Sequence, residues 1–299
     1  MTILAVRAAG SLRGAAALDQ ALGDPWAPDD DTSRFSAAER ARLTAAAPVV
    51  PGRAVPLVLL HAFPLSSAMW GPVVAELPEL PILAIDLPGA GFSPAIDPAT
   101  IRAAGLAVIE SLAELGVKRA VVGGVSMGGY VAMSVIKDAP ELAAGLVLMH
   151  TKAGADDPAG RAARLETARQ VLQASSTEIL APMAAQMISA VSRAAQPGLV
   201  ETIEHWIDQA TPGGVAWAEE AMAGRPDALG ILRASGLQTL IVAGSEDPFA
   251  PVAAAEQMAD AIGPTASLVV LSGVAHLGPL EAPDVIARLV RESYRRMVG

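Results

Sequence analysis

The side chain best suited to nucleophilic chemistry lies in the stretch Gly124-Val125-Ser126-Met127-Gly128. This serine has a glycine two positions away on either side, and it stands between an apolar run and a segment of helical character. The pattern is typical of a nucleophile elbow, a sharp strand-to-helix turn that exposes the serine hydroxyl. A glycine is expected at each flank because a Cβ there would collide with the chain packed alongside. By itself the pattern fits an ordinary turn with a surface serine equally well.

A serine hydroxyl becomes a strong nucleophile only when a base accepts its proton, and an acid usually orients that base. Both residue types occur further along the chain. Asp247 follows the apolar run 238–244, and His276 follows the run 267–271. The carboxyl ends of parallel strands meet at one edge of a sheet, so Ser126, Asp247 and His276 are expected to converge there. Glu246 is the alternative acid.

The elements that would position these residues are short and nearly all apolar. Such runs, separated by helical segments, are typical of a mostly parallel, twisted sheet with helices on both faces, which is an α/β fold. A capping box at Ser36 and Glu39 predicts a helix to about Ala46. Strands are predicted at residues 2–6 (an edge strand), 57–60, 82–86, 120–125, 145–149, 238–243 and 267–271, and helices at 100–115, 127–138, 252–262 and 284–297.

One long segment interrupts this alternation. Residues 152–233 contain no convincing strand but several helix starts, at Asp157 before Pro158, at the pair Ser175 and Glu178, and after Gly198. The methionines and tryptophans of this segment are expected mainly to pack between helices, and several to face the site. We therefore divide the chain into an N-terminal extension (1–50), a first core part (51–151), an inserted helical lid (152–233) and a second core part (234–299).

Five motifs follow one another along the chain: His61-Ala62-Phe63-Pro64, the stretch 86–93, the elbow, Gly244-Ser245-Glu246-Asp247, and His276. In this order they resemble the α/β-hydrolases of the group that contains 3-oxoadipate enol-lactonases, cofactor-free haloperoxidases and small carboxylesterases. The resemblance covers about residues 55–299. It implies that Ser126 is the nucleophile, His276 the general base and acid, and Asp247 the orienting carboxylate. It also implies an oxyanion hole made by the backbone N–H groups of Phe63 and Met127.

The chain departs from this group at two places, and one further residue bears on a related group. Ala62 stands where the group usually has glycine, which would cost about 1 kcal/mol if the position needs a positive φ. About fifty residues precede the first core strand, where the group has a hairpin. Tyr130 occupies a position at which the related menaquinone-pathway lyases tend to have arginine, which argues against that reaction.

The resemblance implies a serine hydrolase that cleaves a small ester, lactone or enol-lactone through an acyl-enzyme intermediate, with no cofactor. Three alternatives stay open: a cofactor-free perhydrolase or haloperoxidase, acyl transfer to an alcohol or amine, and a hydrolase-fold ligand-binding protein with little turnover. Serine at the elbow argues against haloalkane dehalogenase and epoxide hydrolase chemistry, which needs a carboxylate nucleophile.

The remaining polar candidates are given structural roles. His61 is expected to brace the oxyanion loop, and Asp86 to hydrogen-bond within its own turn. His150 follows a strand end and is expected either to line the pocket or to lie at the surface or behind the site, whereas His205 is expected to be solvated. The four histidines lack the spacing of a metal site, so no metal is expected.

Composition agrees with a globular enzyme. The 299 residues are 52% hydrophobic, and the formal net charge is −10 without a Lys/Arg cluster, which argues against partners such as nucleic acid or an anionic membrane surface. No cysteine is present, so disulfides and thiol chemistry are excluded. No apolar run reaches the roughly twenty residues of a membrane span. The expected partner is a small-molecule substrate, the expected location is cytoplasmic, and self-association is left open.

Overall fold

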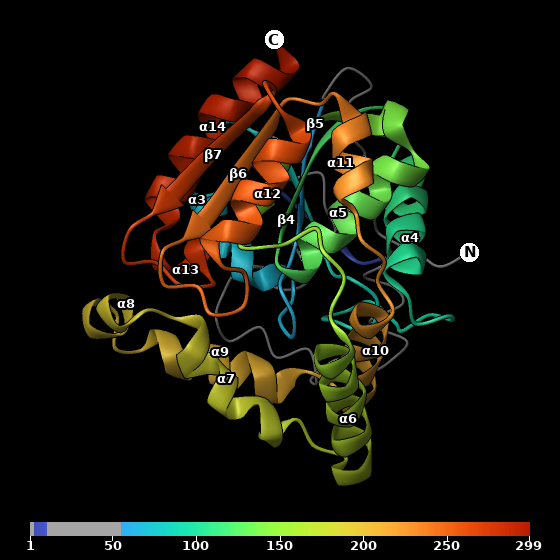
Figure 1. Ribbon diagram of the computed structural model, residues 1–299, viewed down its shortest axis with the longest axis vertical. Helices are drawn as coiled ribbons and strands as arrows, with labels where there is room; N and C mark the ends of the chain where they lie inside the picture. The colour runs from blue at the N-terminus through green and yellow to red at the C-terminus, as the bar shows by residue number, and fades with distance from the viewer. Residues whose placement is uncertain (1–2, 11–54) are drawn as a thin grey trace.

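The computed structural model describes residues 3–10 and 55–299, and the predicted helix at residues 36–46 lies outside them. A seven-stranded sheet in the order β1-β3-β2-β4-β5-β6-β7 forms the centre (Figure 1). Only β1 is antiparallel to its neighbour, and the others are parallel. The strands are β1 (Val6–Gly10), β2 (Leu57–Leu60), β3 (Pro81–Ile85), β4 (Ala120–Val125), β5 (Ala143–Met149), β6 (Thr239–Gly244) and β7 (Ala266–Leu271).

Helices cover both faces of this sheet, which explains why β2 to β6 are apolar along almost their whole length. Helices α3 and α14 pack together on one face, and α4, α5, α11 and α12 form the layer on the other. The core helices are α3 (Gly71–Ala75), α4 (Ile101–Glu114), α5 (Met127–Asp138), α11 (Leu229–Ser235), α12 (Val252–Ile262), α13 (Gly278–Glu281) and α14 (Pro283–Val298).

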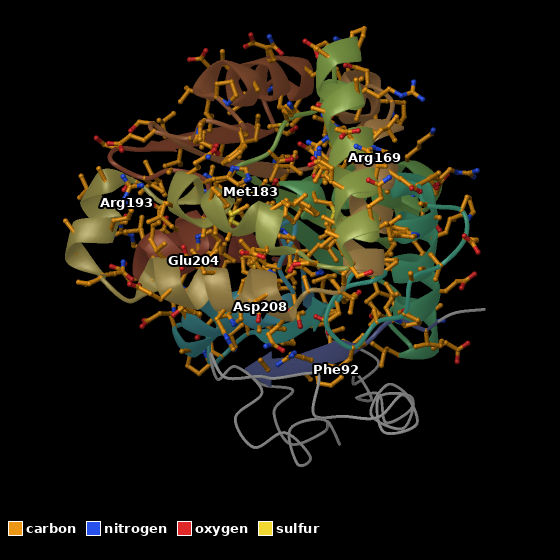
Figure 2. All side chains as sticks on the ribbon, turned by 90° about the horizontal axis from the view of Figure 1, so that it is seen from below. Phe92, Arg169, Met183, Arg193, Glu204 and Asp208 are labelled. Carbon is orange, nitrogen blue, oxygen red and sulfur yellow. The ribbon has the colours of Figure 1, made fainter. Side chains whose placement is uncertain are left out.

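A second group of helices lies across the end of the sheet where the strands terminate (Figure 1). Figure 2 views this group from below, with Arg169 on α6, Met183 on α7, Arg193 on α8, and Glu204 and Asp208 on α9. The group consists of α6 (Pro158–Ala174), α7 (Ala181–Met187), α8 (Ala190–Ala195), α9 (Leu199–Gln209) and α10 (Pro212–Ala223). Within residues 3–10 and 55–299, no helix is both long and apolar enough to cross a bilayer.

The predicted α/β fold class is confirmed. The core strands β2 to β7 and the helices α4, α5, α12 and α14 begin and end within two residues of their predicted bounds, whereas α3, α11 and α13 were not predicted. Two local predictions were wrong. The first strand is Val6–Gly10, not residues 2–6, because it pairs with β3 in a register that joins Val6 to Ile85. Ser175 does not cap a new helix: it ends α6 in a left-handed conformation with φ 50°.

A charged network joins the α6–α10 group to the core. Asp156 forms two 2.7 Å bonds with the guanidinium of Arg225 and a 2.6 Å bond with Arg164. Arg164 also reaches Glu219 on α10 at 2.8 Å. The side chains of Asp156 and Arg225 are only 6% and 3% exposed, so each buried charge needs the other as its counter-charge.

Replacing Asp156 with asparagine is expected to lower the free energy of unfolding by about 3 kcal/mol, because Arg225 would stay buried without its counter-charge. Urea unfolding followed by circular dichroism measures the loss. The matched control is Glu166→Gln, which breaks a fully exposed ion pair with Arg169 on the same helix and is expected to leave the unfolding midpoint unchanged. Equal midpoints for the two variants would contradict this account.

The same network predicts a loss of stability in acid. Burial would raise the pKa of Asp156, but hydrogen bonds and charge from Arg225 and Arg164 outweigh it and hold that pKa well below its usual range. As the pH falls, the unfolded chain therefore binds a proton before the folded chain does. The stabilisation is complete above about pH 5 and declines as the pH falls below about 4. Urea midpoints measured from pH 3 to 7 should fall less steeply for Asp156→Asn than for the wild type.

Candidate active site

Ser126 lies in a strained turn between β4 and α5. Its backbone has φ 53° and ψ −115°, which is unfavourable for a residue with a Cβ. Its N–H donates to Met149 O at 3.0 Å, and its carbonyl accepts from Thr151 Oγ1 at 2.8 Å. A Cβ on Gly124 would approach Gly129 N to 2.6 Å, and one on Gly128 would overlap the backbone at the end of β2. Both glycines are therefore required by close packing, as the elbow pattern predicts.

Asp247 and His276 form a buried hydrogen-bonded pair. Asp247 comes three residues after β6 and His276 five residues after β7, so both lie at the edge of the sheet where β4 delivers Ser126. His276 Nδ1 is 2.9 Å and 2.8 Å from the two carboxylate oxygens. Phe249 packs its ring against the imidazole, with the ring centroids 4.9 Å apart. Since an ionised carboxylate can only accept, Nδ1 carries the proton and Nε2 is left with a lone pair.

Asp247 is held as an anion. Burial would raise its pKa, but contacts with His150 and His276 and the backbone hydrogen bond of Ala250 outweigh it and keep the pKa well below its usual range. Oδ1 accepts from the N–H groups of Phe249 and Ala250 at 2.8 and 3.0 Å, which fixes the carboxylate in place. Glu246, the alternative acid, is exposed.

The structure brings Asp247 and His276 together but leaves the Ser126 hydroxyl without a hydrogen bond to any residue within the described ranges. The same holds for His276 Nε2. Catalytic hydrogen bonds are often long without substrate and tighten in the reacting complex. The Ser126 side chain is half-buried and the imidazole is only 4% exposed, and each keeps one polar atom unbonded.

Phe63 and Met127 supply backbone N–H groups that have no acceptor among residues 3–10 and 55–299. Phe63 follows β2, and Met127 is the first residue of α5, whose N–H points out of the helix start. Ala62 does not adopt a positive φ, so alanine in place of glycine costs no backbone strain there. The predicted oxyanion donors are therefore both unengaged.

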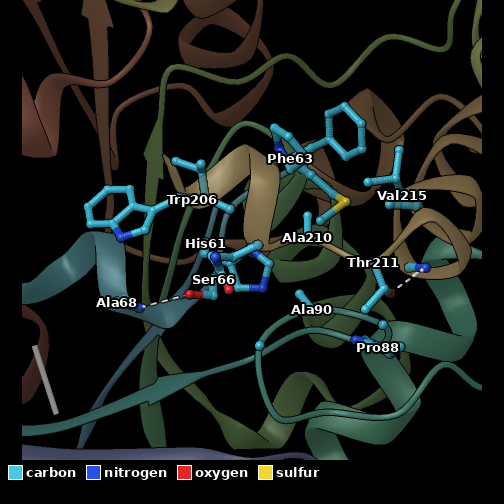
Figure 3. Close-up of a pocket in the computed structure, with 18 residues that line it drawn as sticks. His61, Phe63, Ser66, Ala68, Pro88, Ala90, Trp206, Ala210, Thr211 and Val215 are labelled. Atoms are coloured by element: carbon cyan, nitrogen blue, oxygen red, sulfur yellow. Dashed lines mark hydrogen bonds between the residues drawn. The ribbon is translucent and has the colours of Figure 1, made fainter. Parts of the chain in front are cut away.

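A cavity of about 50 Å³ lies beside these two residues (Figure 3). It is closed on one side by direct backbone contact between the loop after β3 and the start of α10, since a Cβ on Gly89 would lie 2.8 Å from Gly214 Cα. Thr211 caps this helix start by accepting from Gly214 N at 3.0 Å. Residues that line the cavity include Phe63, Ser66, Pro88, Ala90, Trp206 and Val215.

His61 and Asp86 support the loops around the cavity, as predicted. His61 is fully buried, and burial is the main cause that lowers its pKa. Leu87 N donates to its Nε2 at 2.9 Å, and its Nδ1 lies 2.9 Å from Ala62 O. The Asp86 carboxylate accepts from Phe92 N in its own turn, and from Ser67 N in the loop after β2. These bonds fix the two loops relative to each other.

Two contacts that sequence reasoning missed connect His276 to the α6–α10 group. The carbonyl of Met187, at the end of α7, accepts from His276 N at 2.9 Å. The buried carboxylate of Glu281 accepts from Ala275 N and from Ser189 N, both at 2.9 Å. The bonds that reach the α6–α10 group leave no spacing signal, because Met187 and Ser189 are far along the chain from His276 and Glu281. His205 is exposed, as expected.

His150 is buried directly behind the pair. Its Nδ1 is 3.5 Å from Asp247 Oδ2, and both side chains are fully inaccessible to solvent. The prediction left three positions open for this side chain: lining the pocket, lying at the surface, or lying behind the site. The structure places it against the carboxylate instead of at the surface.

A family model described as the Alpha/beta hydrolase family matches residues 57–289. An esterase from Thermogutta terrifontis, solved with malate bound, is 33% identical with a TM-score of 0.79, over 82% of this chain and 91% of that one. The enol-lactonase from Burkholderia xenovorans LB400 is 23% identical with a TM-score of 0.74, over 83% and 94%, and this likeness concerns the fold alone.

A curated 2-succinyl-6-hydroxy-2,4-cyclohexadiene-1-carboxylate synthase from Enterobacter sp. (strain 638) is 33% identical over 114 residues. That match covers 38% of this chain and 44% of the synthase, so less than half of that relative is represented. The family match, by contrast, spans the sheet from β2 to β7 and extends into α14. The elbow, the parallel sheet and the family match together establish that this chain belongs to the alpha/beta hydrolase family.

Proposed function

We propose that the protein is a serine hydrolase that cleaves a small ester or lactone through an acyl-enzyme intermediate. The observation that carries the proposal is the buried His276–Asp247 pair at the same sheet edge as a strained serine and two unengaged N–H groups. Electrostatic stabilisation and a positioned base are what acyl transfer requires. The neighbouring esterase, which covers most of this chain, supports ester chemistry.

In the proposed mechanism, Ser126 Oγ attacks the substrate carbonyl while His276 Nε2 takes its proton. The N–H groups of Phe63 and Met127 hold the negative oxygen of the tetrahedral intermediate. His276 then gives its proton to the leaving alkoxide, which leaves an acyl group on Ser126. Water attacks this ester, again with His276 as base, and releases the acid. Asp247 keeps the Nδ1–H of His276 in place throughout.

The cavity beside Phe63 and Met127 favours a short acyl or alcohol group. Its volume of about 50 Å³ corresponds to about four water-sized positions, by the usual space requirement of a buried water. We therefore expect acetyl and propionyl esters to be turned over faster than octanoyl esters.

A graded series of p-nitrophenyl esters beside a panel of lactones tests this proposal, together with fluorophosphonate labelling and peptide mapping. Rapid turnover with the label on Ser126 is the expected result. Slow labelling without turnover would instead favour a ligand-binding protein. A parallel assay of peroxide-dependent bromination reports on the perhydrolase alternative.

The synthase reaction of the curated relatives is not proposed. Tyr130 replaces the arginine expected for such enzymes, and its ring lies under the Arg225 guanidinium at 4.2 Å. Arg225 is itself bound to Asp156 in the network described above. This arginine is thus committed to a structural ion pair.

A further inference from the structure

We propose that His150 is a positioning residue for the triad, with its Nδ1–H directed at Oδ2 of Asp247. The inference rests on the proposed function, because it assigns a role to the carboxylate that orients His276. His150 Nδ1 lies 3.5 Å from Oδ2, just beyond hydrogen-bond distance. The N–H of Phe249 and that of Ala250 both serve Oδ1, so His150 approaches the oxygen that has fewer donors.

The imidazole of His150 has no other use in this part of the structure. Both ring nitrogens are buried and make no hydrogen bond with any described residue. A buried polar group without a partner is costly, so native proteins keep few of them. A lone pair on Nδ1 facing an anionic oxygen would be repelled, which assigns the proton to Nδ1. The nearest partner for that proton is Oδ2.

The backbone conformation of His150 and the space left by a neighbouring glycine also fit the position of this ring. His150 has φ 47°, and only two other non-glycine residues in the described ranges have positive φ: Ser126 in the elbow and Ser175 at a helix end. Its N–H is held by Val242 O at 2.8 Å, so the strain is imposed by the pairing of β5 and β6. Gly278 makes room for the imidazole, since a Cβ there would overlap the ring.

The titratable groups around His150 come from four elements: the loops after β6 and β7, and the helices α5 and α13. Asp247 and His276 face it from the loops after β6 and β7, and the two imidazole centroids are 6.4 Å apart. Tyr130 on α5 lies within the electrostatic reach of Asp247. Glu281 is engaged by the N–H groups of Ala275 and Ser189. The charge that His150 modulates is therefore that of the Asp247–His276 pair.

A donor on Oδ2 draws negative charge away from His276 and holds the carboxylate plane. Without it, the carboxylate stabilises the protonated form of His276 more strongly. The acid limb of the pH profile, where kcat/KM rises as the base loses its proton, then moves to higher pH. His150→Leu removes this contact between an N–H and the carboxylate. It is expected to lower kcat/KM for p-nitrophenyl acetate about tenfold and to move this limb up by about half a pH unit.

Three further variants make the test specific. His150→Asn keeps an N–H near Nδ1 and tolerates a positive φ, so it should keep the wild-type acid limb. Gly278→Ala displaces the ring and should move the limb as His150→Leu does, but it should have no such effect in the His150→Asn background, where the smaller side chain leaves room. His205→Leu, on the exposed face of α9, is the control and should leave both quantities unchanged.

A direct measurement avoids dependence on the folding of these variants. Long-range ¹H–¹⁵N correlation spectra of the wild type at pH 8 should show the His150 proton on Nδ1. A proton on Nε2, or an unmoved acid limb in folded His150→Leu, would overturn the proposal. Failure of the proposed function itself is distinguishable, because wild-type protein would then show neither turnover nor labelling of Ser126.

Discussion

Replacing Ser126 with alanine is expected to lower kcat/KM for p-nitrophenyl acetate by about five to six powers of ten, as in enzymes whose nucleophile acts as one unit with its base. His276 would keep its bond to Asp247, and the N–H groups of Phe63 and Met127 would stay in place. They would have no covalent intermediate to stabilise. Initial rates at high enzyme concentration, with burst kinetics for the wild type, measure the difference.

Ser272→Ala is the matched control for this variant, because Ser272 is an exposed serine in the loop that leads to His276. It should keep full activity and full fluorophosphonate labelling. Alanine at 126 still has a Cβ at φ 53°, so the thermal unfolding temperature should change little. A Ser126→Ala protein that retained wild-type esterase activity would refute the assignment of the nucleophile.

Asp247→Asn is expected to reduce kcat about 10⁴-fold while the protein stays folded. The N–H groups of Phe249 and Ala250 would orient the asparagine carbonyl oxygen toward themselves, because they need an acceptor. The side-chain NH₂ would then face His276 Nδ1, which would have to accept. That selects the tautomer with the proton on Nε2, and such an imidazole cannot take the proton of Ser126.

Glu246→Gln is the control that separates the two acids considered from the sequence. Glu246 is exposed and lies outside the pair with His276, so its loss should leave kcat within a factor of two, as for an ordinary surface substitution. Large losses for Glu246→Gln together with a mild effect of Asp247→Asn would mean that the acid was misassigned. Steady-state kinetics from pH 5 to 9 on both variants decides between them.

The sequence predicted the sheet well because its signals are local. Each parallel strand is buried on both faces, so it appears as an unbroken apolar run such as Leu57–Leu60. The elbow turn at Ser126 was predicted for a similar reason, since the glycines that the turn requires are near neighbours of this serine. Asp247 and His276 were predicted to lie at one edge of the sheet because the ends of parallel strands mark that edge.

One error is local, whereas the omissions come from contacts between residues that are distant in the chain. Ser175 was expected to start a helix, yet its N–H is bonded to Leu172 O in the last turn of α6. His150 and Gly278 are 128 positions apart in numbering, and only folding shows that one leaves space for the other. Glu281 accepts from Ser189 N, 92 positions away, and the Met187 carbonyl accepts from His276 N. A backbone carbonyl carries no residue signature at all.

The bond from the His276 amide to the Met187 carbonyl has a kinetic consequence. An ester large enough to displace the end of α7 would pull on the backbone of His276, the residue proposed to receive the proton. Oversized esters should then bind almost as well as small ones yet react slowly. Discrimination by size would appear in turnover number more than in apparent affinity, so that the enzyme rejects a poor substrate after admitting it.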